Sequence, residues 1–495
     1  MPRYSLLRSG TTPRPRIAVS TLHTGLMVGI GVLVSGCQTP PRADVESAEA
    51  IAAAAGLAAP VEFLVVGAEG GPIDEPDTAG STLTLAEAVR RAVTTDPGLQ
   101  AAMARIRVAI ADSNQARLLP NPVLNVVLRW GPGKPQIEAS LAQDFVEAIQ
   151  MPRRANAADN RMRQAAAEAV TAALDVTSDV QERYTAAQAA AALVPLLSER
   201  LTLVEKLAAT AKARLDAGEG TRGDVATLEA QRVELRVDID RARLTEREER
   251  LGLARLIGEP SSAAEWTLDA WSVPSIGDEP EAAWVEAGLR HRPEIQAIAW
   301  RLRALGDDEA LVRLLPWEGA TIGVDIQRDD ELFAGPSVSA PIPVFDMGQA
   351  RRARVTAEQL EARHELTLVK RNVVQEVRVA FQTLEASRSN LARIRDELIP
   401  LQLHRRQFAE DAYRAGQTDV TALFRAEQDL GVAQAQAIAV EEQAASALVR
   451  LQRAVGGRRV AASLAAPVAS ALASPDLTTH PQFPPQATRS GHSVP

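Results

Sequence analysis

The chain has 495 residues; 46% are hydrophobic but only 3% are aromatic, and the formal net charge is −9. Aromatic side chains supply much of the buried area of globular cores, so this composition favours long, closely packed helices over compact enzyme domains. The charge disfavours a nucleic-acid-binding protein, which would normally carry a basic face. A single cysteine excludes an internal disulfide framework and a cysteine-based zinc site.

The first 36 residues have the form of a signal peptide. An arginine-rich lead precedes an apolar stretch of about ten residues, the length of a signal-peptide core. The stretch ends in Val34-Ser35-Gly36-Cys37, which resembles a bacterial lipobox and contains the only thiol in the chain. We therefore expect Cys37 to be lipidated, the alternative being an incidental buried cysteine behind an ordinary export signal. By resemblance, Gln38 after the cysteine favours sorting to the outer membrane.

Two segments have the composition of irregular chain. Residues 37–80 are rich in Ala, Pro and Gly without a period, and we expect a lipidated flexible tether there. Residues 458–495 are similarly biased, which predicts a disordered C-terminal tail.

The rest of the chain is a tandem duplication of one sequence unit. Asp96-Pro97 corresponds to Arg292-Pro293, 196 residues later, and the same offset carries Met151 to Met347. Further on, Ala217-Gly218 corresponds to Ala415-Gly416 at an offset of 198. We therefore expect a first repeat over 81–258, a linker or equatorial segment over 259–278, and a second repeat over 279–457.

Each repeat has the pattern helix, two short strands, very long helix, turn, long helix. Apolar residues recur at spacings of three and four along the long helices, which is typical of a coiled-coil seam. A helix from residue 151 to 218 would extend roughly 100 Å at about 1.5 Å per residue. Pro195 and Pro400 are expected to bend or restart these helices. Gly218 and Gly416 are expected to end them in the left-handed conformation.

Each repeat also holds a candidate membrane hairpin, at about 122–143 and about 320–342. Apolar residues alternate with polar ones such as Asn125 and Asp325, the pattern of an outer-membrane barrel strand; the return strand of the second repeat continues it through Val338, Ala340 and Ile342. The alternative is a half-buried soluble hairpin against a helix. Four strands cannot close a barrel, so several copies of the chain are expected to form one barrel together. The predicted lipid-facing residues are Leu124, Val126, Leu128, Trp130, Ile322, Val324 and Ile326.

Together these features resemble the TolC-type outer-membrane efflux channel family. The resemblance rests on the Leu85-Ala-Glu-Ala-Val89 opening, the Leu-Leu-Pro before each hairpin, Ser339-Ala-Pro-Ile-Pro-Val-Phe-Asp-Met-Gly-Gln349, and the two glycine turns. It implies a mainly α fold of tandem helical hairpins with a small membrane β part. It also implies a homotrimer with a shared 12-stranded barrel in outer-membrane lipid. The partners implied are a periplasmic adaptor (membrane fusion) protein and an inner-membrane efflux pump.

The resemblance extends to cargo and to the ends of the hairpins. Two motifs resemble the divalent-cation exporter branch of the family more than its drug exporter branch. They are Met151-Pro-Arg-Arg154 and Pro343-Val-Phe-Asp-Met-Gly-Gln-Ala-Arg-Arg352. Many members of the family carry paired aspartates that narrow the periplasmic mouth of the channel. This chain has Asp419 and Arg425 in that stretch, which suggests a gate closed by an acidic and a basic residue together. The residues expected at the tips, as an adaptor-docking surface, are Gly218, Thr221, Arg222, Asp224, Gly416, Gln417 and Asp419. The alternative is that they only cap helices.

Enzyme chemistry is not expected. The histidines have no second histidine at helical ligand spacing, so no metal site or cofactor is predicted. The segment from Gly218 to Gly223 matches a dinucleotide-binding pattern, but it joins two helices instead of a strand and a helix. The sequence therefore predicts a passive channel component of a tripartite efflux system. The alternatives are a periplasmic coiled-coil adaptor and a structural lipoprotein.

Overall fold

The computed structural model describes residues 43–57, 59–66, 82–132, 135–269, 279–328 and 331–457; Cys37 and the tail over 458–495 lie outside the described residues. Helices dominate, which confirms the predicted mainly α fold class with a small β part. Before residue 270 the elements are α2 (Ala43–Ala55), β1 (Thr82–Leu83), α3 (Leu85–Thr95), α4 (Pro97–Ala116), β2 (Val123–Arg129), β3 (Gln136–Asp144), α5 (Phe145–Asp216), α6 (Arg222–Leu256) and β4 (Thr267–Leu268). After residue 278 they are α7 (Glu281–His291), α8 (Pro293–Val312), the 3₁₀ turn η1 (Leu315–Trp317), β5 (Thr321–Arg328), β6 (Leu332–Ser339), α9 (Gln349–Arg393), the π-helical turn η2 (Ile394–Leu398), α10 (Ile399–Arg414) and α11 (Val420–Ala454).

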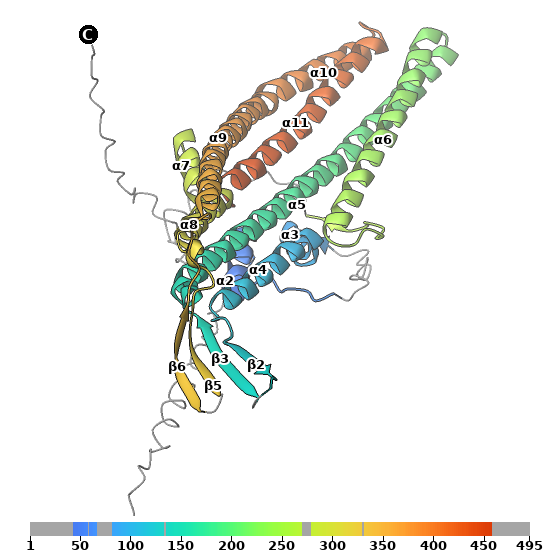
Figure 1. Ribbon diagram of the computed structural model, residues 1–495. Coiled ribbons are helices and arrows are strands. Elements are labelled where there is room, and N and C mark those ends of the chain that lie inside the picture. The colour runs from blue at the N-terminus through green and yellow to red at the C-terminus, as the bar shows by residue number, and fades with distance from the viewer. Residues whose placement is uncertain are drawn as a thin grey trace, which may run out of the picture. The chain divides into compact units, whose positions relative to one another are not determined.

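The two halves of the chain share one order of elements. Two short helices, a β-hairpin and a helical hairpin follow one another in each half (Figure 1). The first helical hairpin is α5 with α6, and the second is α9 and α10 with α11. The second strand hairpin ends at Ser339, so Ala340 and Ile342, expected in the return strand, lie beyond it.

The prolines act differently in the two long helices. Helix α5 is 72 residues long and passes through Pro195 without a break, so the expected restart does not occur there. In the second repeat the helical chain is continuous but changes to a π-helical turn, η2, directly before α10, and Pro400 lies in the first turn of α10. A proline there requires no backbone N–H partner, and the wider π turn relieves the clash between its ring and the carbonyl four residues earlier.

Small side chains let the helices pack closely. Along α5, Ala169 and Ala173 are fully buried, and Ala166 nearly so. The distance between helix axes depends on the side chains at the contact, so these alanines bring α5 close to its neighbours. Buried residues form one large cluster around α2 to α6, a second among α7, α8, α9 and α11, and a third between the two helical hairpins.

The segment expected to be a flexible tether is partly folded. Helix α2 packs on α5, and its Ile51 is completely buried. After it, the Arg107 guanidinium lies 4.0 Å from the centroid of the Phe63 ring, and the Leu64 N–H donates to the Gln100 side chain. Within the segment predicted as a flexible tether over 37–80, residues 43–57 and 59–66 thus have a defined structure, because buried apolar contacts offset the conformational entropy lost on ordering.

Candidate membrane sheet and helical tips

The two strand hairpins form a single antiparallel sheet in the order β2-β3-β5-β6. Strand β3 of the first repeat pairs with β5 of the second, with Ala139 opposite Ile326 and Leu141 opposite Val324. Within the part of the chain that the structure describes, β2 and β6 each pair on one side only. One chain therefore contributes an open, four-stranded sheet with two free edges.

One face of this sheet is apolar and exposed. The register aligns Leu124, Leu141, Val324 and Pro336 in one row across the four strands, and Val126, Ala139, Ile326 and Ala334 in the next. Of the residues predicted to face lipid, the six within strands have 43% to 67% of their surface exposed. Trp130 directly follows β2 and is also exposed.

The opposite face is mainly polar. Asn125, Ser140 and Asp325 lie in one row, and Arg129 forms an ion pair with Glu138 nearby. At the junction between the hairpins, a Cβ added to Gly323 would collide with the Leu141 carbonyl oxygen and press on the Ala142 backbone. The close approach of β3 and β5 therefore depends on glycine at this position.

Arginines near the start of each long helix contact neighbouring segments of the chain. The Arg154 guanidinium donates to the carbonyls of Ala116 (3.0 Å) and Leu118 (2.7 Å), which satisfies the free carbonyls at the end of α4. Its neighbour Arg153 forms an ion pair with Asp307 of α8 at 3.0 Å. In the second repeat, Arg352 donates to the Met347 carbonyl. The arginines that carried the resemblance to the divalent-cation branch thus hold structural contacts in this chain.

The first helical tip ends in a glycine turn. Gly218 has a φ of +81°, and the Glu219 N–H donates to the Arg214 carbonyl at 2.8 Å, the bond that closes a Schellman motif. The returning helix begins with a capping box, in which Thr221 accepts from the Asp224 N–H at 3.1 Å and the Asp224 carboxylate accepts from the Thr221 N–H at 3.3 Å. Arg222 is exposed at the start of α6.

The second tip repeats this geometry. Gly416 has a φ of +70°, and the Gln417 N–H donates to the Ala412 carbonyl at 2.9 Å. Asp419 caps α11 by accepting from the Ala422 N–H at 3.2 Å. Arg425 is exposed, and within the described residues of one chain it forms no ion pair with Asp419.

The contacts between the two tips were missed by the sequence analysis. The Arg214 guanidinium lies 4.7 Å from the centroid of the Tyr413 ring, and apolar residues of both hairpins cluster beside it. Further along α5, burial lowers the pKa of Arg200, and burial raises the pKa of Glu427 on α11. The sequence holds no local signal for these contacts, because each joins residues about 200 positions apart.

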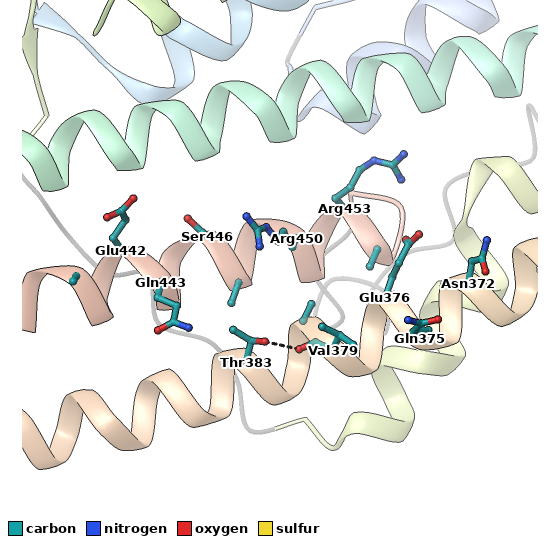
Figure 2. A pocket seen from close by; sticks show the side chains of 14 residues that line it. Asn372, Gln375, Glu376, Val379, Thr383, Glu442, Gln443, Ser446, Arg450 and Arg453 are labelled. Carbon is teal, nitrogen blue, oxygen red and sulfur yellow. Dashed lines mark hydrogen bonds between the residues drawn. The ribbon is translucent and has the colours of Figure 1, made fainter. Parts of the chain in front are cut away.

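A cavity of about 820 Å³ lies between α9 and α11 in the second repeat (Figure 2). Gln375, Thr383 and Glu442 line it, and burial together with the nearby Glu249 raises the pKa of the Glu442 carboxyl. In the first repeat, Tyr184 occupies the position of Ala380 and bonds to the Leu83 carbonyl at 2.8 Å and the Asp269 N–H at 2.9 Å. The equivalent position thus carries a large, hydrogen-bonded side chain in the first repeat and a small alanine, lining the cavity, in the second. Among the described residues, no cluster of three or more His, Cys, Asp or Glu side chains has a geometry that would hold a metal ion.

Comparison with known proteins agrees with this architecture. Residues 284–457 match the family described as outer membrane efflux protein. The outer membrane efflux protein BepC of Brucella suis biovar 1 is 28% identical over 275 residues, which make up 53% of this chain and 59% of BepC. The aligned part therefore spans less than two thirds of that relative.

Solved structures share the fold. The outer membrane protein VceC from Vibrio cholerae superposes with a TM-score of 0.64 at 18% identity, covering 75% of this chain and 96% of VceC. CusC superposes with a TM-score of 0.64 at 14% identity, covering 80% of this chain and 99% of CusC. Outer membrane efflux proteins are passive conduits, so the prediction that the chain is not an enzyme is confirmed. Residues 284–457 therefore match the outer membrane efflux protein family, and the chain shares the fold of solved outer membrane channels.

Proposed function

We propose that this protein is a homotrimeric outer-membrane conduit, to which each chain contributes four strands of a shared 12-stranded barrel. The open sheet with one apolar, exposed face carries this proposal. A free strand edge in hydrocarbon leaves backbone groups unpaired at a cost of several kcal/mol each, so β2 of one copy must pair with β6 of the next. Trimeric homologues in the family support three copies.

In this proposal the conduit receives cargo from an inner-membrane pump through a periplasmic adaptor. Helix α5 begins directly after β3 and has 72 residues, so its far end lies roughly 100 Å from the sheet at about 1.5 Å per residue. The exposed glycine turns at the two tips are the proposed docking surface for the adaptor. The proposal also includes lipidation of Cys37, which by resemblance would add three acyl chains; several chains anchor a protein more firmly than one.

Divalent metal cations are the proposed cargo, on the resemblance of the two arginine motifs alone. Because a passive conduit takes its specificity mainly from its pump, the cargo is tested separately from the conduit. The alternative functions, a periplasmic adaptor or a structural lipoprotein, are disfavoured because neither requires an open four-stranded sheet with an apolar face.

The conduit is tested by native mass spectrometry of the full protein in mild detergent, together with export in a deletion strain. We expect a trimer whose chains begin at an acylated Cys37, and a deletion strain that regains tolerance only when the full chain is restored. A monomer, or a deletion strain with unchanged tolerance to cations and drugs alike, would overturn the conduit. If the restored chain gives tolerance to drugs but not to divalent cations, the proposed cargo is wrong and the proposed conduit stands.

A further inference from the structure

The cavity between α9 and α11 has a size and a lining that suit a small ligand. Its volume of about 820 Å³ lies within the range of about 300–1,000 Å³ that is usual for pockets holding drug-sized molecules. Val379 and Ala380 of α9 and Ala447 of α11 give it an apolar wall, and Gln375 and Gln443 add amide groups (Figure 2). Small-molecule sites generally combine such apolar contact with a few polar groups.

Three of the four charged side chains that line this cavity are paired with opposite charges. The pairs are Arg450 with Glu182 (3.0 Å), Glu376 with Arg292 (2.7 Å), and Arg453 with Asp175 (2.5 Å) and Glu294 (2.8 Å). Because carboxylates neutralise both arginines, the lining has little attraction for an anion. The Nη1 atom of Arg453 is buried and makes no hydrogen bond within the described part of the chain, so it can still donate to a neutral acceptor.

The fourth charged side chain, Glu442, is not balanced in this way. Among the described residues no Lys or Arg side chain forms an ion pair with it. Its side chain is partly buried, and burial together with the nearby Glu249 raises the pKa of the Glu442 carboxyl. Both causes disfavour the ionised form, and a cation beside the carboxylate would favour it. The cavity therefore holds one negative charge that a positively charged ligand could balance.

The lining favours an organic cation over a metal ion. Metal ions need several ligands, and no cluster of three or more His, Cys, Asp or Glu side chains in the described ranges could hold one. An organic cation instead brings its own apolar body. We propose that the cavity between α9 and α11 binds an amphipathic organic cation, with its charged group beside Glu442 and its apolar body against Val379 and Ala447. This inference requires neither the proposed trimer nor the proposed cargo, because the residues that carry it all belong to one chain.

Binding of rhodamine 6G, a fluorescent amphipathic organic cation, tests the site. Equilibrium dialysis of the full protein in mild detergent should show saturable binding of one dye molecule per chain. E442Q should weaken binding roughly ten-fold, since it removes the charge that pairs with the cation. The control is E385Q, which removes a carboxylate on α9 that lies outside the cavity and is already paired with Arg388. No saturable binding, or equal weakening in the two variants, would overturn the site.

Obstruction of the cavity provides an independent readout of its location. S446F introduces a ring into the α11 side of the cavity and should abolish saturable binding. V432F, at an exposed position of the same helix outside the cavity, should leave binding unchanged. Binding to S446F as tight as binding to the unaltered protein would contradict the location.

Competition tests the class of ligand. An equal concentration of Zn²⁺ should leave the dye bound, and displacement of the dye would show that the site takes a metal ion, which overturns the ligand class. If the protein is trimeric by native mass spectrometry but binds no dye, the site is wrong and the conduit stands. If it binds the dye as a monomer, the conduit fails and the site stands.

Discussion

The guanidinium of Arg214, in the last turn of α5, lies 4.7 Å from the centroid of the Tyr413 ring, in the last turn of α10. This contact joins the ends of the two helical hairpins, one from each repeat. Leu423 and Phe424 of α11 and Leu228 of α6 are buried in the same cluster. The two tips of one chain are thus held together by a cation on an aromatic ring and by an apolar patch behind it.

Removing the Arg214 guanidinium should weaken the contact between the two helical tips without unfolding the chain. The Tyr413 residue is buried, and a cation over a desolvated ring contributes up to about 2 kcal/mol, so R214A should raise amide hydrogen exchange near Tyr413 by roughly 10-fold. The matched control is K212A, on the same turn of α5 but exposed. Equal exchange in the two variants would show that the apolar cluster alone holds the tips.

Gly323 should be required where the two strand hairpins join. The G323V variant introduces side-chain atoms against the backbone of β3 and should destabilise the sheet by about 1–3 kcal/mol, the usual cost of overpacking. Gly335 in β6 has open space around the position of its Cβ, and G335A is therefore the control. The check is the fraction of protein that assembles into heat-resistant oligomers, which should fall only for G323V.

The two faces of the sheet should tolerate charge very differently. An arginine at Val324, in the apolar row, should cost about 2–4 kcal/mol at mid-membrane depth. Replacing the adjacent Asp325 with Asn, on the polar face, should leave the unfolding free energy nearly unchanged. Denaturant unfolding in lipid vesicles measures both variants, and similar losses at the two positions would contradict the assignment of the faces.

The Glu442 carboxyl in the α9–α11 cavity should make stability depend on pH. Burial, together with the nearby Glu249, raises its pKa above the usual 4.5, so the folded state binds a proton more readily than the unfolded state. The ionised Glu442 carboxylate therefore lowers the stability of the folded protein above the pKa of the folded state. Below about pH 4.5 the carboxyl is protonated in both states and this loss of stability is absent. E442Q should raise the thermal midpoint at pH 7, and the gain should disappear near pH 4. A gain that persists at pH 4 would indicate a packing effect.

Local sequence patterns determined much of the architecture. The glycines at 218 and 416 end the long helices with positive φ, as expected, because only glycine adopts that conformation without steric cost. The alternation through Leu124 and Val126 gave a strand with one apolar face, because successive strand residues point to opposite sides. Such features depend on neighbours within a few residues, so periodicity and turn chemistry suffice to predict them.

Tertiary structure decided the contacts that join distant parts of the chain. Sequence alone did not pair β3 with β5, fold α2 onto α5, or place Arg214 on Tyr413. The unbroken helix through Pro195 also depends on context, since the packing of α5 outweighs the local cost of the proline. These outcomes depend on how apolar faces and charges far apart in the sequence meet, and no local pattern encodes that geometry.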